Sequence, residues 1–365
     1  MNACFHLQGA RERAATLYPE AWCARIFSRA RLSNAFFWGV VVWISLAFQA
    51  HAVDLRIGIV GTDSSHSPKF AQAFNDPKAP ERVPGARIVC AFKGGSPDME
   101  RSRSRVDAFG AELRDKYGVD LVDSIAELVK RCDAIMILSV DGRAHLPQAK
   151  EIFGAGKPVF IDKPLGGNLA DSIALVRLAR ETKTPLFSCS NYRFADGLAK
   201  MKAGSPGRLR FAQVYGPATI EPLMPDFYFY VVHVTESLYT LLGPGCVSVA
   251  RTSTKDGEIA TGVWSDGRMG VVTGLHGTRV GNGALAMGER KVVSETLDTN
   301  FPALANAILI FFRTGEAPVK LAETLEIMAF MQAADESKRR GGAPVALAEI
   351  MAMNGGENLA ASTMP

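Results

Sequence analysis

The sequence predicts an α/β protein with two domains: a doubly wound parallel sheet, then an α+β domain with an open, mostly antiparallel sheet. The length of 365 residues suits two domains. Between residues 55 and 189, short apolar runs alternate with amphipathic helical stretches, the pattern of parallel strands buried on both faces. After residue 208, several runs are separated by Gly, Asp and Ser turns, which is typical of strands joined by hairpins.

Residues 1–52 are interpreted as a Sec-type signal peptide. The apolar stretch Ala35–Phe48 follows three arginines and precedes Ala50-His51-Ala52, a small-residue cleavage pattern. The stretch is short for a membrane span, and the alternatives are a buried helix or an uncleaved anchor. The mature chain would begin at Val53, be exported to the periplasm or the extracellular space, and have no stable membrane insertion. If translation starts at a later codon, the protein is expected in the cytoplasm.

The first domain is predicted to span residues 53–190. Its strands are expected at Leu55–Val60, Arg87–Phe92, Val119–Val122, Ala134–Ser139, Pro158–Ile161 and Pro185–Ser190. Helices are expected at about Ser67–Phe74, Met99–Lys116, Ser124–Arg131, Ala144–Phe153 and Leu169–Glu181. Ser67-Pro68 has the form of an N-cap followed by proline at the first helical position. Right-handed crossovers would place helices on both faces of the sheet, so we expect a Rossmann-type domain.

The second domain is predicted to span residues 191–350, and residues 351–365 form a tail. Its strands are expected at Arg208–Tyr215, Val247–Thr252, Glu258–Trp264, Met269–Leu275 and Lys291–Glu295, and its helices at Phe229–Leu242, Pro302–Phe312 and Leu321–Arg339. An open sheet exposes an apolar face that would aggregate in water unless it is covered. We therefore expect a homo-oligomer built sheet to sheet.

Composition excludes several classes of function. The net charge of +4 comes from scattered Lys and Arg, so no nucleic acid partner is expected. The cysteines beyond the signal peptide, Cys90, Cys132, Cys189 and Cys246, lack the C-x-x-C spacing of a zinc or redox site. They are expected to be small buried side chains rather than disulfides. Six scattered histidines give no metal-binding pattern.

The first strand is followed by a candidate nucleotide-binding turn. In the dinucleotide fingerprint G-x-G-x-x-G only Gly61 is present, and Asp63 and His66 replace the other two glycines. Gly61 permits the tight turn, and the following helix N-terminus offers N–H groups to a phosphate. Gly61 and its polar neighbours are therefore cofactor-binding candidates, namely Thr62, Ser64 and Ser65. Asp63 would repel a pyrophosphate unless its carboxylate points away, and a plain strand–turn–helix is the alternative.

Three further candidates stand at strand ends. Domains that bind NAD usually have an acidic residue after the second strand, which binds the ribose 2′-hydroxyl. Lys93 stands there instead and favours NADP over NAD, although a solvated loop lysine is an equal alternative. Ser139 ends the fourth strand. Lys163, in Asp162-Lys163-Pro164, follows the fifth strand, at the edge where such sheets bind ligands.

With these motifs in this order, the sequence resembles the glucose–fructose oxidoreductase/inositol dehydrogenase/MocA (Gfo/Idh/MocA) family from about Leu55 to Ile350. Asp162-Lys163-Pro164 is similar to the family's Glu-Lys-Pro motif. The helix ending at Leu242-Gly243 is similar to the one that carries the family's catalytic histidine, here His233, with an acid three residues later. That acid is Glu236, where Asp is usual. The altered glycine fingerprint indicates a divergent branch.

The resemblance implies an NAD(P)-dependent oxidoreductase acting on CH–OH groups. A hydride would pass between a sugar or cyclitol carbon and the nicotinamide of the cofactor. His233 would be the base because imidazole titrates near neutrality, and Lys163 would hydrogen-bond the reacting oxygen or lie near the nicotinamide ribose. Glu236 would orient the His233 ring or bind a substrate hydroxyl, and Arg193 and Tyr230 are candidate substrate contacts.

Two alternative functions stay open. The first is an exported, redox-inactive carbohydrate-binding protein on the same fold, because two fingerprint glycines are lost and free cofactor is scarce outside the cytoplasm. The second is an NAD-assisted glycosidase that recycles a tightly held cofactor.

Overall fold

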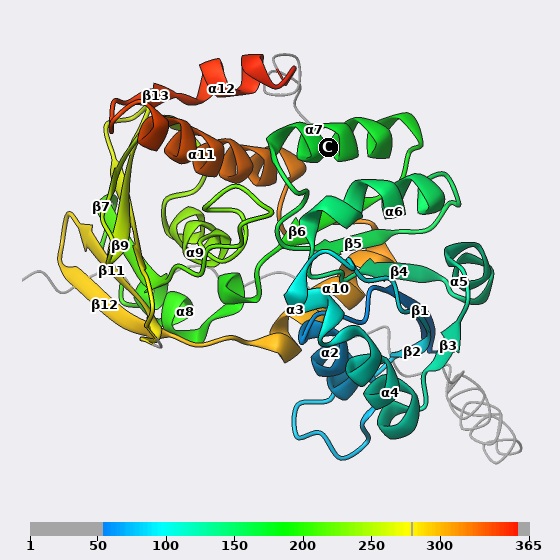
Figure 1. The fold of residues 1–365 in the computed structure, drawn as a ribbon. Coiled ribbons are helices and arrows are strands. Elements are labelled where there is room, and N and C mark those ends of the chain that lie inside the picture. Colours follow the sequence, from blue (N-terminus) through cyan, green and yellow to red (C-terminus); the bar gives the residue numbers. More distant parts are fainter. Residues whose placement is uncertain (1–53, 279, 357–365) are drawn as a thin grey trace, which may run out of the picture. The chain divides into compact units, whose positions relative to one another are not determined.

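The computed structural model describes residues 54–278 and 280–356. Both sheets of the described part are shown in Figure 1: a six-stranded sheet in the order β3-β2-β1-β4-β5-β6, and a seven-stranded sheet in the order β12-β11-β7-β10-β9-β8-β13. The interpretation of residues 1–52 as a signal peptide lies outside the described residues. Within 54–278 and 280–356 no helix has the length and apolarity of a membrane span.

The first sheet is parallel throughout, which confirms the doubly wound prediction. Its strands are β1 (Leu55–Val60), β2 (Ala86–Phe92), β3 (Asp120–Val122), β4 (Ala134–Ile137), β5 (Val159–Asp162) and β6 (Leu186–Cys189). The chain winds outward in opposite directions from β1 and β4. In such sheets the ligand crevice lies beyond the carboxyl ends of the strands at this switch point.

Helices cover both faces of the first sheet. One face packs against α5 (Ile125–Arg131), α6 (His145–Ile152) and α7 (Leu169–Glu181) through a core that includes Leu128 and Ile152. The other face packs against α2 (His66–Asn75), α4 (Val106–Tyr117) and α10 (Phe301–Thr314). Sequence order assigned α10 to the second domain, but its apolar side chains complete the core of the first sheet.

The second sheet is mixed and mostly antiparallel, as predicted; β7 and β10 form a parallel pair. Its strands are β7 (Leu209–Pro217), β8 (Cys246–Ser253), β9 (Gly257–Trp264), β10 (Met269–Leu275), β11 (Asn282–Gly288), β12 (Val292–Leu297) and β13 (Val345–Ala346). Helices α9 (Val232–Leu242) and α11 (Leu321–Arg339) lie on one face, with α8 (Asp196–Ala203) near β12 and α12 (Leu347–Met353) beside α11 (Figure 1).

Several elements differ from the sequence expectations. The helix expected over residues 99–116 is two helices, α3 (Glu100–Arg103) and α4, separated at Arg105, whose backbone leaves the helical region. Helix α2 begins one residue earlier than expected, and Ser67 is not its cap, since the Ser67 hydroxyl donates to the Gly61 carbonyl. Strand β11 was not predicted because two glycines interrupt its pattern, and α8 and α12 are too short for a clear helical period.

Candidate active site

Four segments bring their chemical groups to the carboxyl edge of the first sheet. His66 starts α2 after the β1 turn, Asp162 and Lys163 end β5, and Ser190 follows β6. His233 comes from the first turn of α9, which follows β7 of the second sheet. The two candidates for acid–base chemistry, Lys163 and His233, therefore come from different sheets and meet at the ligand-binding edge, as their electrostatic interaction also indicates.

The His233 ring is held on three sides. Its side chain is almost fully buried, and its Nδ1 lies 2.7 Å from the Ser190 hydroxyl. The rings of Tyr192 and Tyr230 meet it edge-on, at centroid distances of 5.2 and 5.3 Å. Within the described part of the chain, His233 Nε2 has no hydrogen-bond partner. Burial, aided by the positive charge of Lys163, lowers the pKa of His233 well below its usual value, so the ring is neutral at neutral pH.

The contacts of Ser190 are compatible with the form of His233 that can accept a proton. The hydroxyl accepts the Tyr192 backbone N–H at 3.1 Å and can donate to Asn191 Oδ1 at 3.4 Å. In that arrangement His233 Nδ1–H donates to Ser190, and the lone pair on Nε2 is free. Glu236 was expected either to orient the ring or to bind a substrate hydroxyl, and the first of these roles was wrong: the hydrogen-bond partner of the ring is Ser190.

Lys163 presents a free ammonium group. No hydrogen bond or ion pair to its Nζ is found within residues 54–278 and 280–356. Burial lowers the pKa of Lys163, and the neighbouring Asp162 carboxylate opposes that effect. An unpaired ammonium beside a neutral imidazole suits the stabilisation of a hydroxyl oxygen that loses its proton.

Glu236 and Arg193 form a buried ion pair. The Arg193 guanidinium, 11% exposed, donates to Glu236 Oε2 at 2.8 Å and also to Glu323 of α11. Burial raises the pKa of Glu236 to about 7 even though Arg193 opposes the shift. With its guanidinium committed to two carboxylates, Arg193 ties α9 to α11, and the structure places Tyr230, rather than Arg193, against the His233 ring.

The turn after β1 keeps the shape of a nucleotide-binding turn. Gly61 has φ +95°, and a Cβ there would lie 2.4 Å from the Ser139 backbone nitrogen, so only glycine fits. Ser64 accepts the His66 backbone N–H, and Ser65 is exposed at the N-terminus of α2 without a side-chain capping bond. The Ser139 hydroxyl also lies against Gly61, and it is hydrogen-bonded to the Gln148 side chain.

The middle of the turn is tied to the protein itself. The Thr62 hydroxyl donates to the Val106 carbonyl at 2.8 Å. The Asp63 carboxylate is directed to two partners, the Ser102 hydroxyl at 2.5 Å and the Val140 N–H at 3.1 Å, and accepts a hydrogen bond from each. Burial raises the pKa of Asp63, and these two hydrogen bonds oppose the rise. The predicted repulsion between Asp63 and a pyrophosphate is therefore reduced by its orientation.

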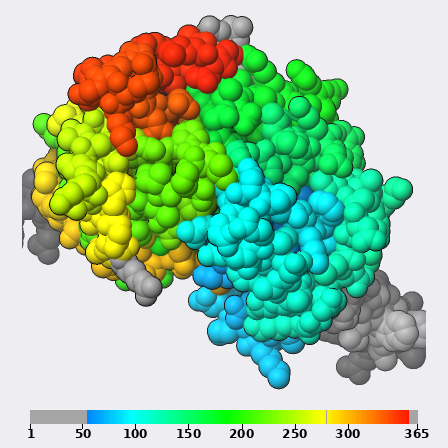
Figure 2. Space-filling model, viewed as in Figure 1, coloured from blue at the N-terminus to red at the C-terminus, as the bar shows by residue number. Residues whose placement is uncertain are grey.

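Residues 93–106, which we call the covering segment, supply the Val106 carbonyl and the Ser102 hydroxyl in these contacts. The segment contains α3 and is the cyan region near the centre of Figure 2. Its Asp98 forms a bidentate pair with Arg143 at 3.0 Å, and Arg101 lies 5.0 Å from the Phe229 ring centroid. Lys93 pairs with Asp107 at 2.9 Å in an exposed position. The covering segment thus joins the turns after β1 and β4 to the loop before α9.

These residues fit a dinucleotide at two places. The tight turn at Gly61 and the uncapped start of α2, with Ser64 and Ser65, fit a phosphate group. The free nitrogens of Lys163 and His233 fit the region where nicotinamide and substrate would meet. Thr62 and Asp63 fit less well, because the covering segment already binds both side chains.

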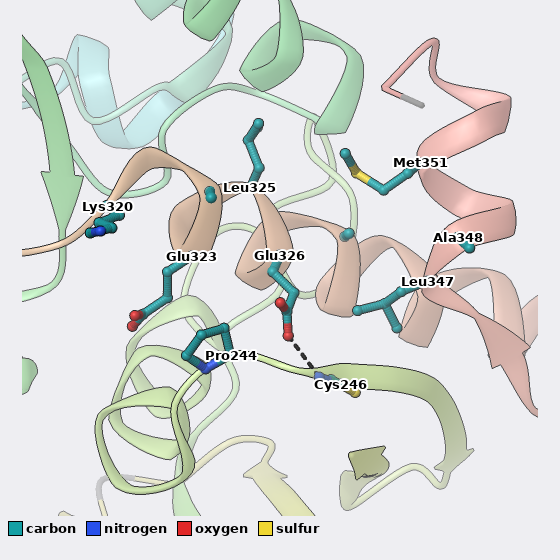
Figure 3. Close-up of a pocket in the computed structure, with 11 residues that line it drawn as sticks. Pro244, Cys246, Lys320, Glu323, Leu325, Glu326, Leu347, Ala348 and Met351 are labelled. Carbon is teal, nitrogen blue, oxygen red and sulfur yellow. Dashed lines mark hydrogen bonds between the residues drawn. The ribbon is translucent and has the colours of Figure 1, made fainter. Parts of the chain in front are cut away.

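A cavity of about 490 Å³ lies elsewhere, between α11, α12 and the start of β8 (Figure 3). Its walls are mostly apolar, with the carboxylates of Glu323 and Glu326 at one side. Glu326 accepts the backbone N–H groups of Gly245 and Cys246. Neither His233 nor Lys163 lines this cavity.

Several site residues were not found from the sequence. Ser190 and Tyr192 lie close to the candidate Arg193 in sequence, but only the fold shows that they hold His233. Asn282, whose amide donates to the Tyr192 hydroxyl at 2.6 Å, is on the unpredicted β11. His66 was noted only as a missing glycine.

Comparisons with known proteins agree with the fold. Residues 55–189 match the family model GFO_IDH_MocA, described as an oxidoreductase family with an NAD-binding Rossmann fold. Over 124 residues the chain is 33% identical to YceM of Salmonella typhimurium, which carries the name of an oxidoreductase. That match spans 32% of this chain and 40% of YceM.

Solved structures share the fold across both sheets. A scyllo-inositol dehydrogenase from Lactobacillus casei, solved with NAD(H) and scyllo-inositol, has a TM-score of 0.65 at 15% identity, covering 81% of this chain and 99% of that one. A myo-inositol 2-dehydrogenase from Lactobacillus plantarum has a TM-score of 0.65 at 16% identity, covering 80% and 99%. At such low identity these likenesses establish the architecture.

Proposed function

We propose that this chain is a member of the Gfo/Idh/MocA oxidoreductase family, whose NAD-binding Rossmann domain model matches residues 55–189. On that premise we propose that it is an NAD(P)-dependent dehydrogenase of sugar or cyclitol hydroxyl groups. The observation that carries the proposal is the pair of unpartnered nitrogens, His233 Nε2 and Lys163 Nζ, at the carboxyl edge of the first sheet. Structural neighbours that act on inositols support this substrate class.

The residues divide the work as follows. His233, neutral because it is buried, accepts the hydroxyl proton at Nε2. Lys163 donates a hydrogen bond to the same oxygen and stabilises its developing negative charge. The nicotinamide, when bound, supplies the hydride acceptor. Ser190 keeps the His233 ring in the accepting form, and Tyr192 and Tyr230 fix its plane.

We propose NADP rather than NAD as the preferred cofactor. Lys93 follows β2, where NAD-binding domains usually have an acid, and its ammonium is half exposed. A 2′-phosphate would compete with Asp107 for Lys93. The test is Lys93→Ala, which should raise the KM for NADP and leave the KM for NAD unchanged; equal effects on both would contradict the preference.

We also propose that the protein works outside the cytoplasm, because of its N-terminal apolar stretch and cleavage pattern. In that setting a redox-inactive carbohydrate-binding protein is the second candidate function. Its supporting observation is that Thr62 and Asp63 are bound by the covering segment. The two candidates differ in one readout, since the second binds carbohydrate whether or not nucleotide is present.

We propose a homo-oligomer that buries the outer face of the second sheet. Strand register places one row of side chains across it, and these are Val292, Met287, Phe211, Met269 and Val263. Four of the five are exposed. A row of exposed apolar side chains opposite the face covered by α9 and α11 suits a second copy of the same sheet.

The test of the proposed activity is reduction of NAD(P) by the purified protein with a panel of inositols and hexoses. Lys163→Met should lower kcat/KM by about 10²- to 10⁴-fold while the far-UV circular dichroism spectrum is kept. Lys116→Met, on the exposed surface of α4, is the matched control and should change nothing. Nucleotide that neither binds at millimolar concentration nor is reduced would contradict the proposal.

A further inference from the structure

Two departures from the family motifs lie in direct contact. His66 occupies the position of the third fingerprint glycine, and Asp162 occupies the position of the usual glutamate before Lys163. In the structure His66 Nδ1 lies 2.5 Å from Asp162 Oδ2. A glycine has no side chain to make this contact, so the side chain gained at one position binds the shorter acid at the other.

Asp162 is a buried carboxylate whose two oxygens are both bonded. Its side chain is 4% exposed, with Oδ1 accepting the Lys163 backbone N–H at 2.9 Å and Oδ2 bonded to His66. Burial acts to raise the pKa of Asp162, but His66 and Lys163 outweigh it, so the pKa lies below its usual value. The carboxylate is therefore ionised next to the Lys163 ammonium.

His66 is itself fixed in place. Its ring packs edge-on against Phe301 of α10 at 4.9 Å and against Phe70 of α2 at 6.5 Å. The Lys69 ammonium lies 4.5 Å from the centroid of the same Phe301 ring. A ring held by two aromatic contacts cannot swing away from Asp162 without breaking both.

We propose that His66 and Asp162 form a positioning pair that keeps Lys163 in its charged form and holds its backbone at the end of β5. The pair acts through Lys163 and needs no contact with substrate. The inference rests on the proposed function only for its effect on turnover, since the charge of Lys163 is a property of the protein alone.

Other charged groups near His66 and Asp162 also act on the protonation of Lys163. Asp162 favours the ammonium form of Lys163, whereas Arg101 of the covering segment opposes it. His233 on α9 interacts with both Lys163 and His66, and Lys69 lies one turn along α2. Among the described residues, the acid that favours the charged form of Lys163 is Asp162, so its loss should release the Lys163 proton at lower pH.

The experiment is competitive acetylation of the full-length protein with trace acetic anhydride across pH 6–10, with the modification of Lys163 quantified by mass spectrometry. Asp162→Asn should increase labelling of Lys163 near pH 8 by about fivefold or more, because a one-unit fall in pKa gives tenfold more free amine. His66→Gly should do the same, because Asp162 then loses the hydrogen bond that offsets its burial and is protonated more readily. His66→Asn, whose amide can replace the hydrogen-bond donor, should restore the wild-type profile. Lys116 is the internal control.

An unchanged Lys163 profile in both Asp162→Asn and His66→Gly would overturn the proposal. If Asp162→Asn does not fold, the double variant Asp162→Glu with His66→Gly is the substitute. It has the glutamate and the glycine of the family motifs and should show wild-type labelling. In turnover assays His66→Gly should lower kcat with little change in KM, and His66→Asn should recover it. If the labelling of Lys163 shifts in the variants but the wild-type protein has no turnover, the proposed function is contradicted and the positioning pair is supported.

Discussion

Replacement of Arg193 by methionine is the perturbation whose size follows most directly from the structure. The substitution keeps the apolar stem and removes the guanidinium from Glu236, 1% exposed, and from Glu323. Leaving a buried carboxylate without its cation costs about 3–5 kcal/mol. We expect Arg193→Met to lose about that much in free energy of unfolding at pH 8.

The loss should be smaller at low pH. Burial raises the pKa of Glu236 to about 7 with Arg193 in place, and removal of the opposing guanidinium raises it further. A carboxyl group whose pKa is raised by folding stabilises the native state below its unfolded value near 4.5, and that contribution is lost as pH rises through the folded value. One additional unit corresponds to about 1.4 kcal/mol, so the defect at pH 5.5 should be about 1–2 kcal/mol smaller.

The assay is urea unfolding followed by tryptophan fluorescence at pH 5.5 and 8. The double variant Arg193→Met with Glu236→Gln should recover part of the loss at pH 8, because it removes the stranded charge. Arg114→Met, in an exposed pair with Asp115, is the control and should leave the midpoint unchanged. A variant as stable as wild type at both pH values, but with a raised substrate KM, would contradict a stabilising role for Arg193. It would show instead that Arg193 contacts the substrate.

Three further predictions test the turn, the sheet face and a second buried acid. Gly61→Ala should lower stability by about 2 kcal/mol or more, since it combines positive φ with a clash against Ser139; a thermal midpoint equal to wild type would contradict this. Ile259→Lys, on the exposed face of β9, should shift the protein to monomers in sedimentation analysis, and an unchanged oligomer, or a wild type that is itself monomeric, would argue against a sheet-to-sheet interface. Burial raises the pKa of Asp335 to about 7, so its contribution to stability should fall as pH rises from about 4 to 7. In urea unfolding, the free energy of unfolding of Asp335→Asn relative to wild type should therefore increase over that pH range. A difference that does not depend on pH would show that Asp335 does not titrate there.

Local patterns in the sequence were enough for most of the fold. The buried strands β1, β2 and β4 are short apolar runs, and Leu169–Glu181 and Leu321–Arg339 carry a full helical period, so their bounds were predicted closely. Strand β11 was not predicted because it contains Gly283, which is required next to the Tyr215 ring. That requirement comes from a residue far away in the sequence, so the local pattern does not show it. The placement of α10 against the first sheet likewise depends on contacts with residues far earlier in the chain.

The candidate site was predictable in its parts but not in its pairings. His233 and Lys163 could be chosen by residue type and motif, and the fold brings both to the carboxyl edge. Which partner each group has could not be known from spacing: Glu236 is three residues from His233, yet its hydrogen bond goes to Arg193. His66 looked like a lost glycine because its meaning depends on Asp162, distant in sequence and adjacent in space.

The central claim is that this protein transfers a hydride from a hydroxyl-bearing carbon to a nicotinamide cofactor. The most direct measurement uses inositols and hexoses deuterated at the carbinol carbons, incubated with the purified protein and NAD or NADP, with mass spectrometry of the nucleotide. We expect reduced nucleotide carrying one deuterium with wild type, formed about 10²- to 10⁴-fold more slowly with Lys163→Met. Tight binding of carbohydrate without any reduced nucleotide, or an oxidised product without deuterium on the nucleotide, would contradict it.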